Sequence, residues 1–255
     1  MMDQFGITSM SLRCLTSAIV AVLFQAMPSM AQNTIDGFEG RTYKNSTHTM
    51  PYRLFIPKGY DPSKKYPLVL WLHGSGSVGN DNRKQISSAS TLGTHTWTRP
   101  ENQAKYPTFI LAPQCPSGKA WTSPGELTTV LEILAAVQKE FSIDSQRLYV
   151  AGQSMGGYGT WALIALRPNM FAAAIPLCGG GHVADAPRIA KIPIWAFHGE
   201  ADPTVSVWES RKMIEAIKKV GGKPRYSEYP GVRHEVWERT FKEPGLLDWV
   251  FAQHL

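Results

Sequence analysis

The sequence predicts an α/β protein whose mostly parallel central sheet is flanked by helices on both faces. Runs such as 67–72 and 108–112 are continuously apolar, which is typical of strands that are covered on both sides. These strand-like runs alternate along the chain with stretches of helical spacing, for example 127–141. No repeat and no low-complexity linker follows residue 35, so we expect one domain.

The expected elements follow in order along the chain. We predict strands at 50–56, 67–72, 108–112, 147–151, 171–177, 192–197 and 225–229. We predict helices at 127–141, 157–166, 207–220 and 246–253. Pro57 ends the first strand, and Pro168 stops the second helix. Ligands of such sheets bind beyond the carboxyl ends of the strands, so chemically active residues are expected there.

The first 31 residues have the pattern of a secretory signal peptide. An apolar run at 14–24 follows Arg13, and Ser29 and Ala31 are the small residues expected before a cut after Ala31. The run is too short for an ordinary transmembrane helix, and an uncleaved N-terminal anchor is the alternative. If translation starts at Met10 and not at Met1, the segment before the apolar run is more typical of a signal peptide. We therefore expect a secreted or periplasmic chain in which residues 32–255 form a single domain without stable membrane insertion.

Charge and cysteine content exclude several classes of partner. The formal net charge is +6, but the basic residues are scattered, which favours a solvated surface over a nucleic-acid site. The spacing of Cys and His fits no metal centre, and we expect neither a metal nor a cofactor. Cys115 and Cys178 survive cleavage. An exported chain could pair them, but they follow non-adjacent strands, which argues against a disulfide.

The sequence G-x-S-x-G at 152–156 lies between a predicted strand and a predicted helix. In that setting the pattern indicates a nucleophile elbow, in which a serine occupies a strained turn. The glycines two residues away on either side leave room for the neighbouring strand and helix. We therefore predict that Ser154 is a catalytic nucleophile.

A serine nucleophile needs a base, and the base needs an acid that orients it. Asp202 follows the strand at 192–197 in a turn that contains Gly and Pro, and it is the predicted acid, with Glu200 as its rival. An ordinary turn role is the alternative for Asp202. His234 lies in a loop late in the chain and is the predicted base. His73 and His198 each precede a glycine at a strand end, where a histidine more often buttresses the turn.

An oxyanion hole requires two backbone N–H groups that point at the developing negative charge. One is expected from Met155, at the N-terminus of the helix that follows the serine. The second is expected from the glycine-containing loop after the strand at 67–72. Ser75 is the preferred donor in that loop, and Gly76 is the next candidate.

Together, these motifs resemble those of the α/β-hydrolase superfamily. Within it, the chain is similar to the carboxylesterases related to feruloyl and acetyl-xylan esterases and to polyhydroxybutyrate depolymerases. The resemblance covers roughly residue 40 to the end and extends to the segments 52–60 and 112–116. It implies an α/β-hydrolase fold and a triad of Ser154, Asp202 and His234. Prolyl-oligopeptidase-like peptidases share the elbow but carry a large propeller domain for which this chain has no room.

The segment 178–192, where this superfamily usually inserts a lid, is too short for a lid domain. We therefore expect a serine that is open to solvent and to bulky esters. Trp97, Trp121 and Trp237 are candidate walls of the substrate site, and core packing is the alternative for each.

The sequence thus predicts an exported serine carboxylesterase that needs no cofactor. Its substrate would be a small-molecule or polysaccharide-linked ester, with acetyl or feruloyl esters of plant polysaccharides as the first candidates. Short-chain esters and polyesters remain open. The alternatives are a small peptidase of the same mechanism and a non-catalytic carbohydrate-binding protein on the same scaffold.

Overall fold

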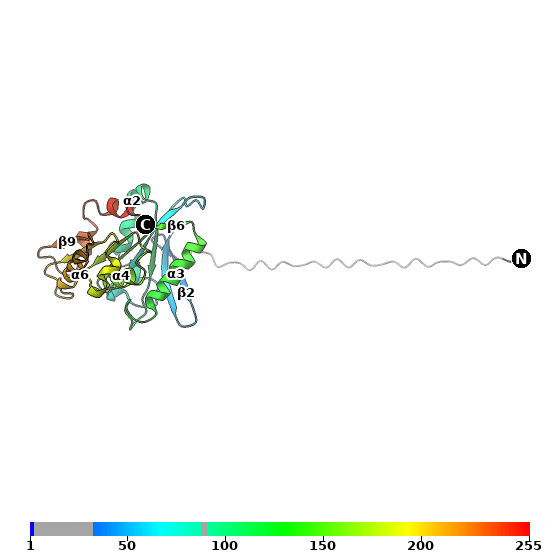
Figure 1. Cartoon of the computed structure of the whole chain (residues 1–255). Coiled ribbons are helices and arrows are strands. Elements are labelled where there is room, and N and C mark those ends of the chain that lie inside the picture. Colours follow the sequence, from blue (N-terminus) through cyan, green and yellow to red (C-terminus); the bar gives the residue numbers. More distant parts are fainter. Residues whose placement is uncertain (3–32, 88–90) are drawn as a thin grey trace. The chain divides into compact units, whose positions relative to one another are not determined.

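The central sheet has nine strands in the order β1-β2-β3-β5-β4-β6-β7-β8-β9. The computed structural model describes residues 1–2, 33–87 and 91–255, and Asn33–Leu255 form one compact unit (Figure 1). Apart from Met1 and Met2, the predicted signal peptide lies outside the described residues. The strands are β1 (Thr34–Ile35), β2 (Phe38–Lys44), β3 (Thr49–Phe55), β4 (Tyr66–Leu72), β5 (Phe109–Pro113), β6 (Ile143–Gln153), β7 (Ala173–Leu177), β8 (Trp195–Gly199) and β9 (Arg225–Tyr229).

The strands β5, β4, β6, β7, β8 and β9 are neighbours in this order, and each pair of neighbours is parallel. At the other end of the sheet, β1, β2 and β3 are joined by antiparallel pairing. The alternation of side chains explains why the central strands are apolar throughout. In β4, Leu68, Leu70 and Leu72 pack into the core on one face, and Val69 and Trp71 pack into the core on the other. A strand that is buried on both sides must be continuously apolar, as the sequence predicted.

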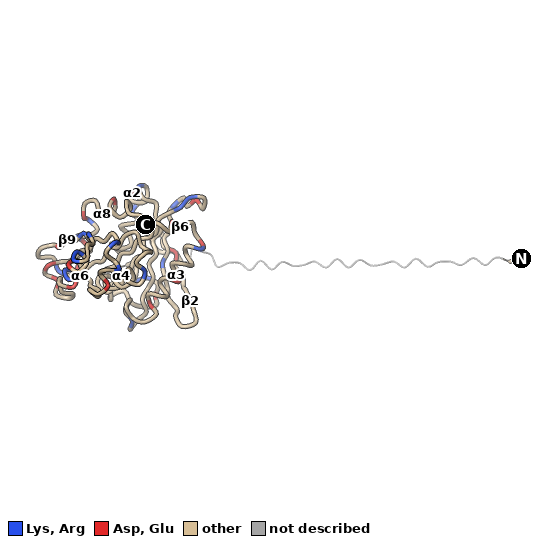
Figure 2. The backbone as a smooth tube through the Cα atoms, viewed as in Figure 1, with Lys and Arg blue, Asp and Glu red and all other residues tan. Residues whose placement is uncertain are grey.

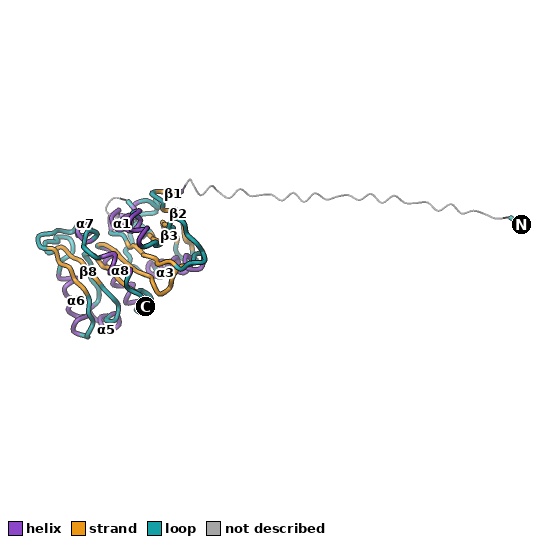
Figure 3. Tube along the Cα trace, turned by 90° about the horizontal axis from the view of Figure 1, so that it is seen from above, coloured by secondary structure: helices purple, strands orange, loops and turns teal. Residues whose placement is uncertain are grey.

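Helices cover both faces of the sheet. One core contains residues of α3 (Glu126–Glu140), α4 (Met155–Leu166), α5 (Ala186–Ile189) and α6 (Trp208–Lys219). The opposite core contains residues of α1 (Thr91–Thr98), α7 (Trp237–Thr240) and α8 (Leu246–Phe251). The short helix α2 (Pro100–Lys105) has no buried residue. Figure 3 shows α7 and α6 on opposite sides of β8. The predicted α/β class with a mostly parallel sheet is therefore confirmed.

The segment 178–194 connects β7 to β8 and holds only a short 3-10 turn and α5. The expectation that no lid domain fits at this place is therefore confirmed. The strands β1 and β2 and the helices α1, α2, α5 and α7 were not predicted. The edge strand β1 has two residues and pairs only with Phe38 and Glu39 of β2. The rest of β2 therefore lies at the edge of the sheet, and only Phe38 of this strand is buried, so its sequence lacks a clear apolar signal.

Charged side chains of both signs are interspersed at the surface. Figure 2 shows them close together around α6 and β9, where Arg211 pairs with Glu228 and Lys212 pairs with Glu209. Among the described residues, no helix combines the length and the apolar character needed to cross a membrane. Cys115 and Cys178 are both buried and free.

Candidate active site

Ser154 stands at the junction between β6 and α4, at the carboxyl end of a central strand. Its φ of 55° and ψ of −116° form a sparsely populated backbone conformation, which costs about 1–3 kcal/mol. Its N–H donates to Leu177 O at 2.9 Å and so ties the turn to β7. A Cβ on Gly156 would overlap the carbonyl oxygen of Leu72. The flanking glycine therefore lets α4 approach β4 closely, and the local structure is the predicted strand, turn and helix.

The structure brings Ser154, His234 and Asp202 together in one chain of hydrogen bonds. The Nε2 atom of His234 lies 2.9 Å from Ser154 Oγ. The Nδ1 atom of the same ring lies 2.6 Å from Asp202 Oδ2. A carboxylate can only accept, so Nδ1 carries the proton and Nε2 is free to accept the proton of the serine hydroxyl. This is the tautomer that a general base for Ser154 requires.

Asp202 follows β8, and its side chain is buried. One oxygen, Oδ1, accepts the N–H groups of Thr204 and Val205 at 2.8 and 2.9 Å. Burial alone would raise the pKa of this carboxyl, but the bonds from His234 and from these two N–H groups lower it below its ordinary value. The rival Glu200 is exposed, and it accepts a bond from Gly231 N–H instead. Asp202 therefore remains charged beside His234.

A second imidazole lies against Asp202. His198 is fully buried, and its Nε2 lies 3.4 Å from Asp202 Oδ2 and 3.0 Å from Val205 O. Its Nδ1 lies 2.7 Å from Ser210 Oγ, on α6. Burial lowers the pKa of His198. The sequence indicated that His198 buttresses the turn, but it gave no signal for the contact with Ser210.

Cys178 was not predicted to be near the site. Its sulfur and the ligand-type atoms of Asp202 and His234 all lie within 4.8 Å of one another, so it must be considered as a nucleophile. The residue is fully buried, and this burial raises the pKa of its thiol well above the ordinary range. A buried, protonated thiol is a poor nucleophile. Ser154, which is partly exposed and bonded to His234, suits that role better.

The two predicted oxyanion donors lie at the starts of two helical turns. Met155 is the first residue of α4, and Ser75 begins the 3-10 turn Ser75–Ser77. The first N–H groups of a helix lack intrahelical acceptors and can bind an anion. The peptide group before Ser75 is held by His73, whose Nδ1 lies 2.7 Å from Gly74 O. His73 also accepts the N–H of Cys115 at 3.0 Å, and burial lowers its pKa to about 4.

Two of the three tryptophans expected at the substrate site are part of the core instead. Trp97 is buried and packs edge-on against Phe241, so the expected contact with substrate is corrected to core packing. Trp121 is also fully buried, and its indole N–H donates to His73 O at 2.9 Å. This bond ties Trp121 to the loop that carries Ser75. Trp237 also belongs to the core, but it is 9% exposed and packs edge-on against the ring of His234 at 5.8 Å between centroids. Of the three, it therefore stays a candidate contact.

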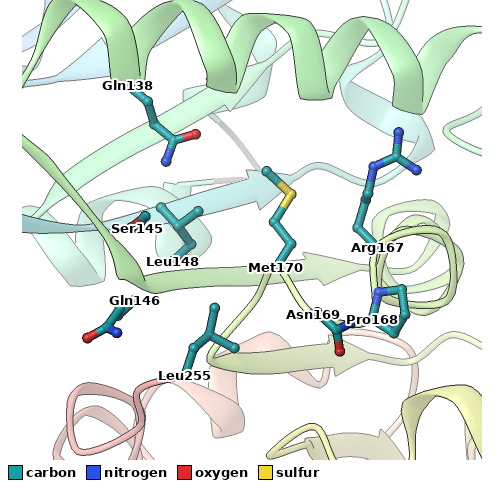
Figure 4. Close-up of a pocket in the computed structure, with 9 residues that line it drawn as sticks. All are labelled: Gln138, Ser145, Gln146, Leu148, Arg167, Pro168, Asn169, Met170 and Leu255. Carbon is teal, nitrogen blue, oxygen red and sulfur yellow. The ribbon is translucent and has the colours of Figure 1, made fainter.

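A hollow of about 600 Å³ lies away from these residues. Figure 4 shows its lining, with Met170 between Leu148 and Arg167. The residues Arg167–Met170 precede β7, and Ser145 and Gln146 lie early in β6. The hollow is therefore at the amino ends of the strands, whereas Ser154 and Asp202 follow carboxyl ends. It is not part of the candidate site.

Comparison with known proteins gives a consistent set of matches. A model of the Esterase family, described as "Putative esterase", matches residues 44–223. The "Probable feruloyl esterase C" of Aspergillus terreus is 30% identical over 157 residues, which cover 61% of this chain and 56% of that protein. The "Bifunctional acetylxylan esterase/xylanase XynS20E" of Neocallimastix patriciarum is 29% identical over 157 residues, which cover 60% of this chain and 21% of that protein.

Among solved structures, one described as a thermostable esterase is 40% identical, with a TM-score of 0.83. The match covers 87% of this chain and 64% of that one. The chain thus spans about half the length of the feruloyl esterase relative and a smaller share of the bifunctional one. These similarities confirm the α/β-hydrolase fold that the sequence motifs predicted.

Proposed function

The chain belongs to the Esterase family, and on this premise we propose that it is a serine carboxylesterase that works through an acyl-enzyme. The observation that carries the proposal is the unbroken hydrogen-bond chain from Ser154 through His234 to Asp202. The proposed roles are those of nucleophile, general base and orienting acid, in that order.

In the first half of the reaction, Ser154 Oγ attacks the ester carbonyl while His234 Nε2 takes the hydroxyl proton. The resulting oxyanion is stabilised by the N–H groups of Met155 and Ser75. His234 then donates the proton to the leaving alcohol, which leaves the acyl group bound to Ser154. Water repeats the same steps to release the acid. Asp202 holds the imidazole in the required tautomer and stabilises its charged form, and no step needs a cofactor.

Esters of plant polysaccharides, either acetyl or feruloyl, are the proposed substrates. The names of two relatives, a feruloyl esterase and an acetylxylan esterase, support this class. The short connection 178–194 supports it as well, because bulky or polymer-bound esters need an open site. The signal-like residues 1–31 support export to the periplasm or the exterior, where such polymers occur.

The test is hydrolysis of 4-nitrophenyl acyl esters, methyl ferulate and acetylated xylan by the protein without residues 1–31, with Ser154→Ala measured beside it. We expect turnover in the wild type and its loss in the variant, and the best substrate identifies the acyl preference. Cleavage of peptides but not esters would favour a peptidase of the same mechanism. Binding of polysaccharide without any turnover would favour a non-catalytic carbohydrate-binding protein.

A further inference from the structure

A second hollow, the side pocket, lies between α4 and α6 beside the loop that follows β7. Its volume is about 200 Å³. The residues that line it include an aromatic and apolar group and a charged pair: Tyr158, Trp161, Gly181, Glu209, Lys212 and Met213.

The side pocket lies at the same edge of the sheet as the candidate active site. Tyr158 is one helical turn beyond Ser154, and its N–H donates to Ser154 O at 3.1 Å. On the other side, Gly180 and Gly181 closely follow Cys178, whose sulfur lies beside Asp202 and His234. Part of the lining of the side pocket therefore belongs to the same two chain segments that carry Ser154 and Cys178.

The glycines after β7 let this loop pack closely against α4 and α6, which line the side pocket. A Cβ on Gly180 would overlap the carboxylate of Glu209, and one on Gly181 would lie 2.9 Å from Cβ of Trp161. A side chain at either position would therefore push the loop away from the two helices and change the shape of the side pocket. The run of glycines at 179–181 thus has a steric reason.

The wall of the side pocket combines two kinds of contact. The apolar part of the wall is formed by Tyr158 and Ala162, which are partly exposed, and by Trp161 and Met213, which are each about 1% exposed. Such a wall suits the face of a ring. Glu209 Oε1 and Lys212 Nζ form an ion pair at 2.7 Å, and each side chain is about 30% exposed. Such a pair can accept a hydrogen bond from a hydroxyl group and donate one back to it.

We propose that the side pocket binds a hydroxylated six-membered ring of the ester substrate, with a ring hydroxyl held by Glu209 and Lys212. The inference rests on the proposed esterase function. An apolar cavity of about 150 Å³ binds benzene in another protein, so a pocket of about 200 Å³ has room for a six-membered ring. A phenolic ring of the acyl group and a sugar ring of the alcohol share the required chemistry, whereas an acetyl group would leave most of the space to water.

Two pairs of esters distinguish a ring of the acyl group from a ring of the alcohol as the group that the side pocket binds. Methyl 4-hydroxycinnamate and methyl cinnamate differ by one phenolic hydroxyl, and methyl 2-O-acetylxyloside and cyclohexyl acetate compare a sugar with a bare ring. A hydrogen bond to a charged group contributes about 1.5–3 kcal/mol, so we expect kcat/KM to favour the hydroxylated member of one pair by about tenfold or more. Glu209→Gln should reduce that preference at least about fivefold. Glu215→Gln, at an exposed position of the same helix, should retain the preference.

A second variant tests the space rather than the charge. Ala162→Leu adds bulk to the lining of the side pocket, and it should lower kcat/KM for the preferred substrate relative to 4-nitrophenyl acetate. Ala135→Leu, at an exposed position of α3, should retain the wild-type ratio. Equal kcat/KM values within both ester pairs, or a preference unchanged by Glu209→Gln, would overturn the inference while leaving the esterase function intact. Hydrolysis of none of the esters would overturn the esterase function itself and this inference with it.

Discussion

His73 is expected to act on the reaction through the backbone of the oxyanion loop. Its ring donates from Nδ1 to Gly74 O at 2.7 Å, and its Nε2 accepts the N–H of Cys115 at 3.0 Å. Gly74 O and the N–H of Ser75 belong to one planar trans peptide group, in which the two point in opposite directions. A bond that fixes the oxygen therefore also fixes the direction of the proposed oxyanion donor.

Two substitutions separate the two hydrogen bonds of His73. An Asn at this position can place its amide nitrogen near Nδ1 and keep the bond to Gly74 O, but it leaves the buried N–H of Cys115 unpaired. A Gln can place its amide oxygen near Nε2 and keep the bond from Cys115, but it loses the bond to Gly74. Because Ser77 N–H also donates to Gly74 O, at 3.1 Å, that oxygen still has a partner in the Gln variant.

The two variants should therefore lose different properties: His73→Asn should mainly lose stability, and His73→Gln should mainly lose activity. His73→Asn should lower the free energy of unfolding by about 1–3 kcal/mol, because a buried donor is left unpaired, and kcat should fall less than about tenfold. His73→Gln should lower the free energy of unfolding by only about 1 kcal/mol. Loss of one oxyanion donor costs about 10²–10³ in kcat. Since Ser77 still holds Gly74 O, we expect a smaller fall, of about 10–100-fold.

The assay is kcat for 4-nitrophenyl acetate, measured well below the temperature of unfolding, together with urea unfolding of the same samples. The result that refutes the reasoning is a parallel response, in which the variant with the lower stability also has the lower kcat. His73 would then act on the reaction only through the stability of the fold.

Further predictions concern the acid, pH, the elbow and the thiols. Asp202→Asn removes the charge that stabilises the protonated His234, so kcat should fall about 10³–10⁴-fold; a fall below tenfold would contradict the proposed role. Burial lowers the pKa of His73 from 6.5 to about 4, so the unfolded chain binds more protons between these values. As the pH falls through this range, the wild type should lose about 3 kcal/mol more stability than His73→Asn in urea unfolding, and parallel pH profiles would count against this. Gly156→Ala should lower stability by about 3 kcal/mol or more, because the new Cβ meets Leu72 O; thermal unfolding at the wild-type temperature would disprove that steric argument. Because Cys115 and Cys178 are buried and free, Ellman's reagent should label them only after denaturation, and rapid labelling of the native protein would be inconsistent with their burial.

The parts of the fold that the sequence predicted are those whose physical signal is local. The strand β4 is apolar at every position because it is buried on both faces, so its composition reveals its place in the sheet. The elbow around Ser154 was predictable because only a tight turn between strand and helix needs glycines at both flanking positions. The order of Ser154, Asp202 and His234 along the chain then limited the candidates for acid and base.

Features that depend on long-range packing were not predictable in this way. No predicted helix or strand covers Trp97 or Trp121, but the structure buries both of them. No local pattern distinguishes a tryptophan that lines a pocket from one that fills the core. The position of Cys178 beside Asp202 and His234 arises from the adjacency of β7 and β8. The side pocket likewise requires α4 and α6, which are distant in sequence, to flank one glycine loop.

The most direct test of Ser154 as nucleophile is the intact mass of the protein after treatment with a fluorophosphonate, which labels activated serines. We expect one adduct on the wild type, located by peptide mapping at Ser154, and none on Ser154→Ala. An adduct that persists in Ser154→Ala, or that maps to another residue of the site, would contradict the proposed mechanism.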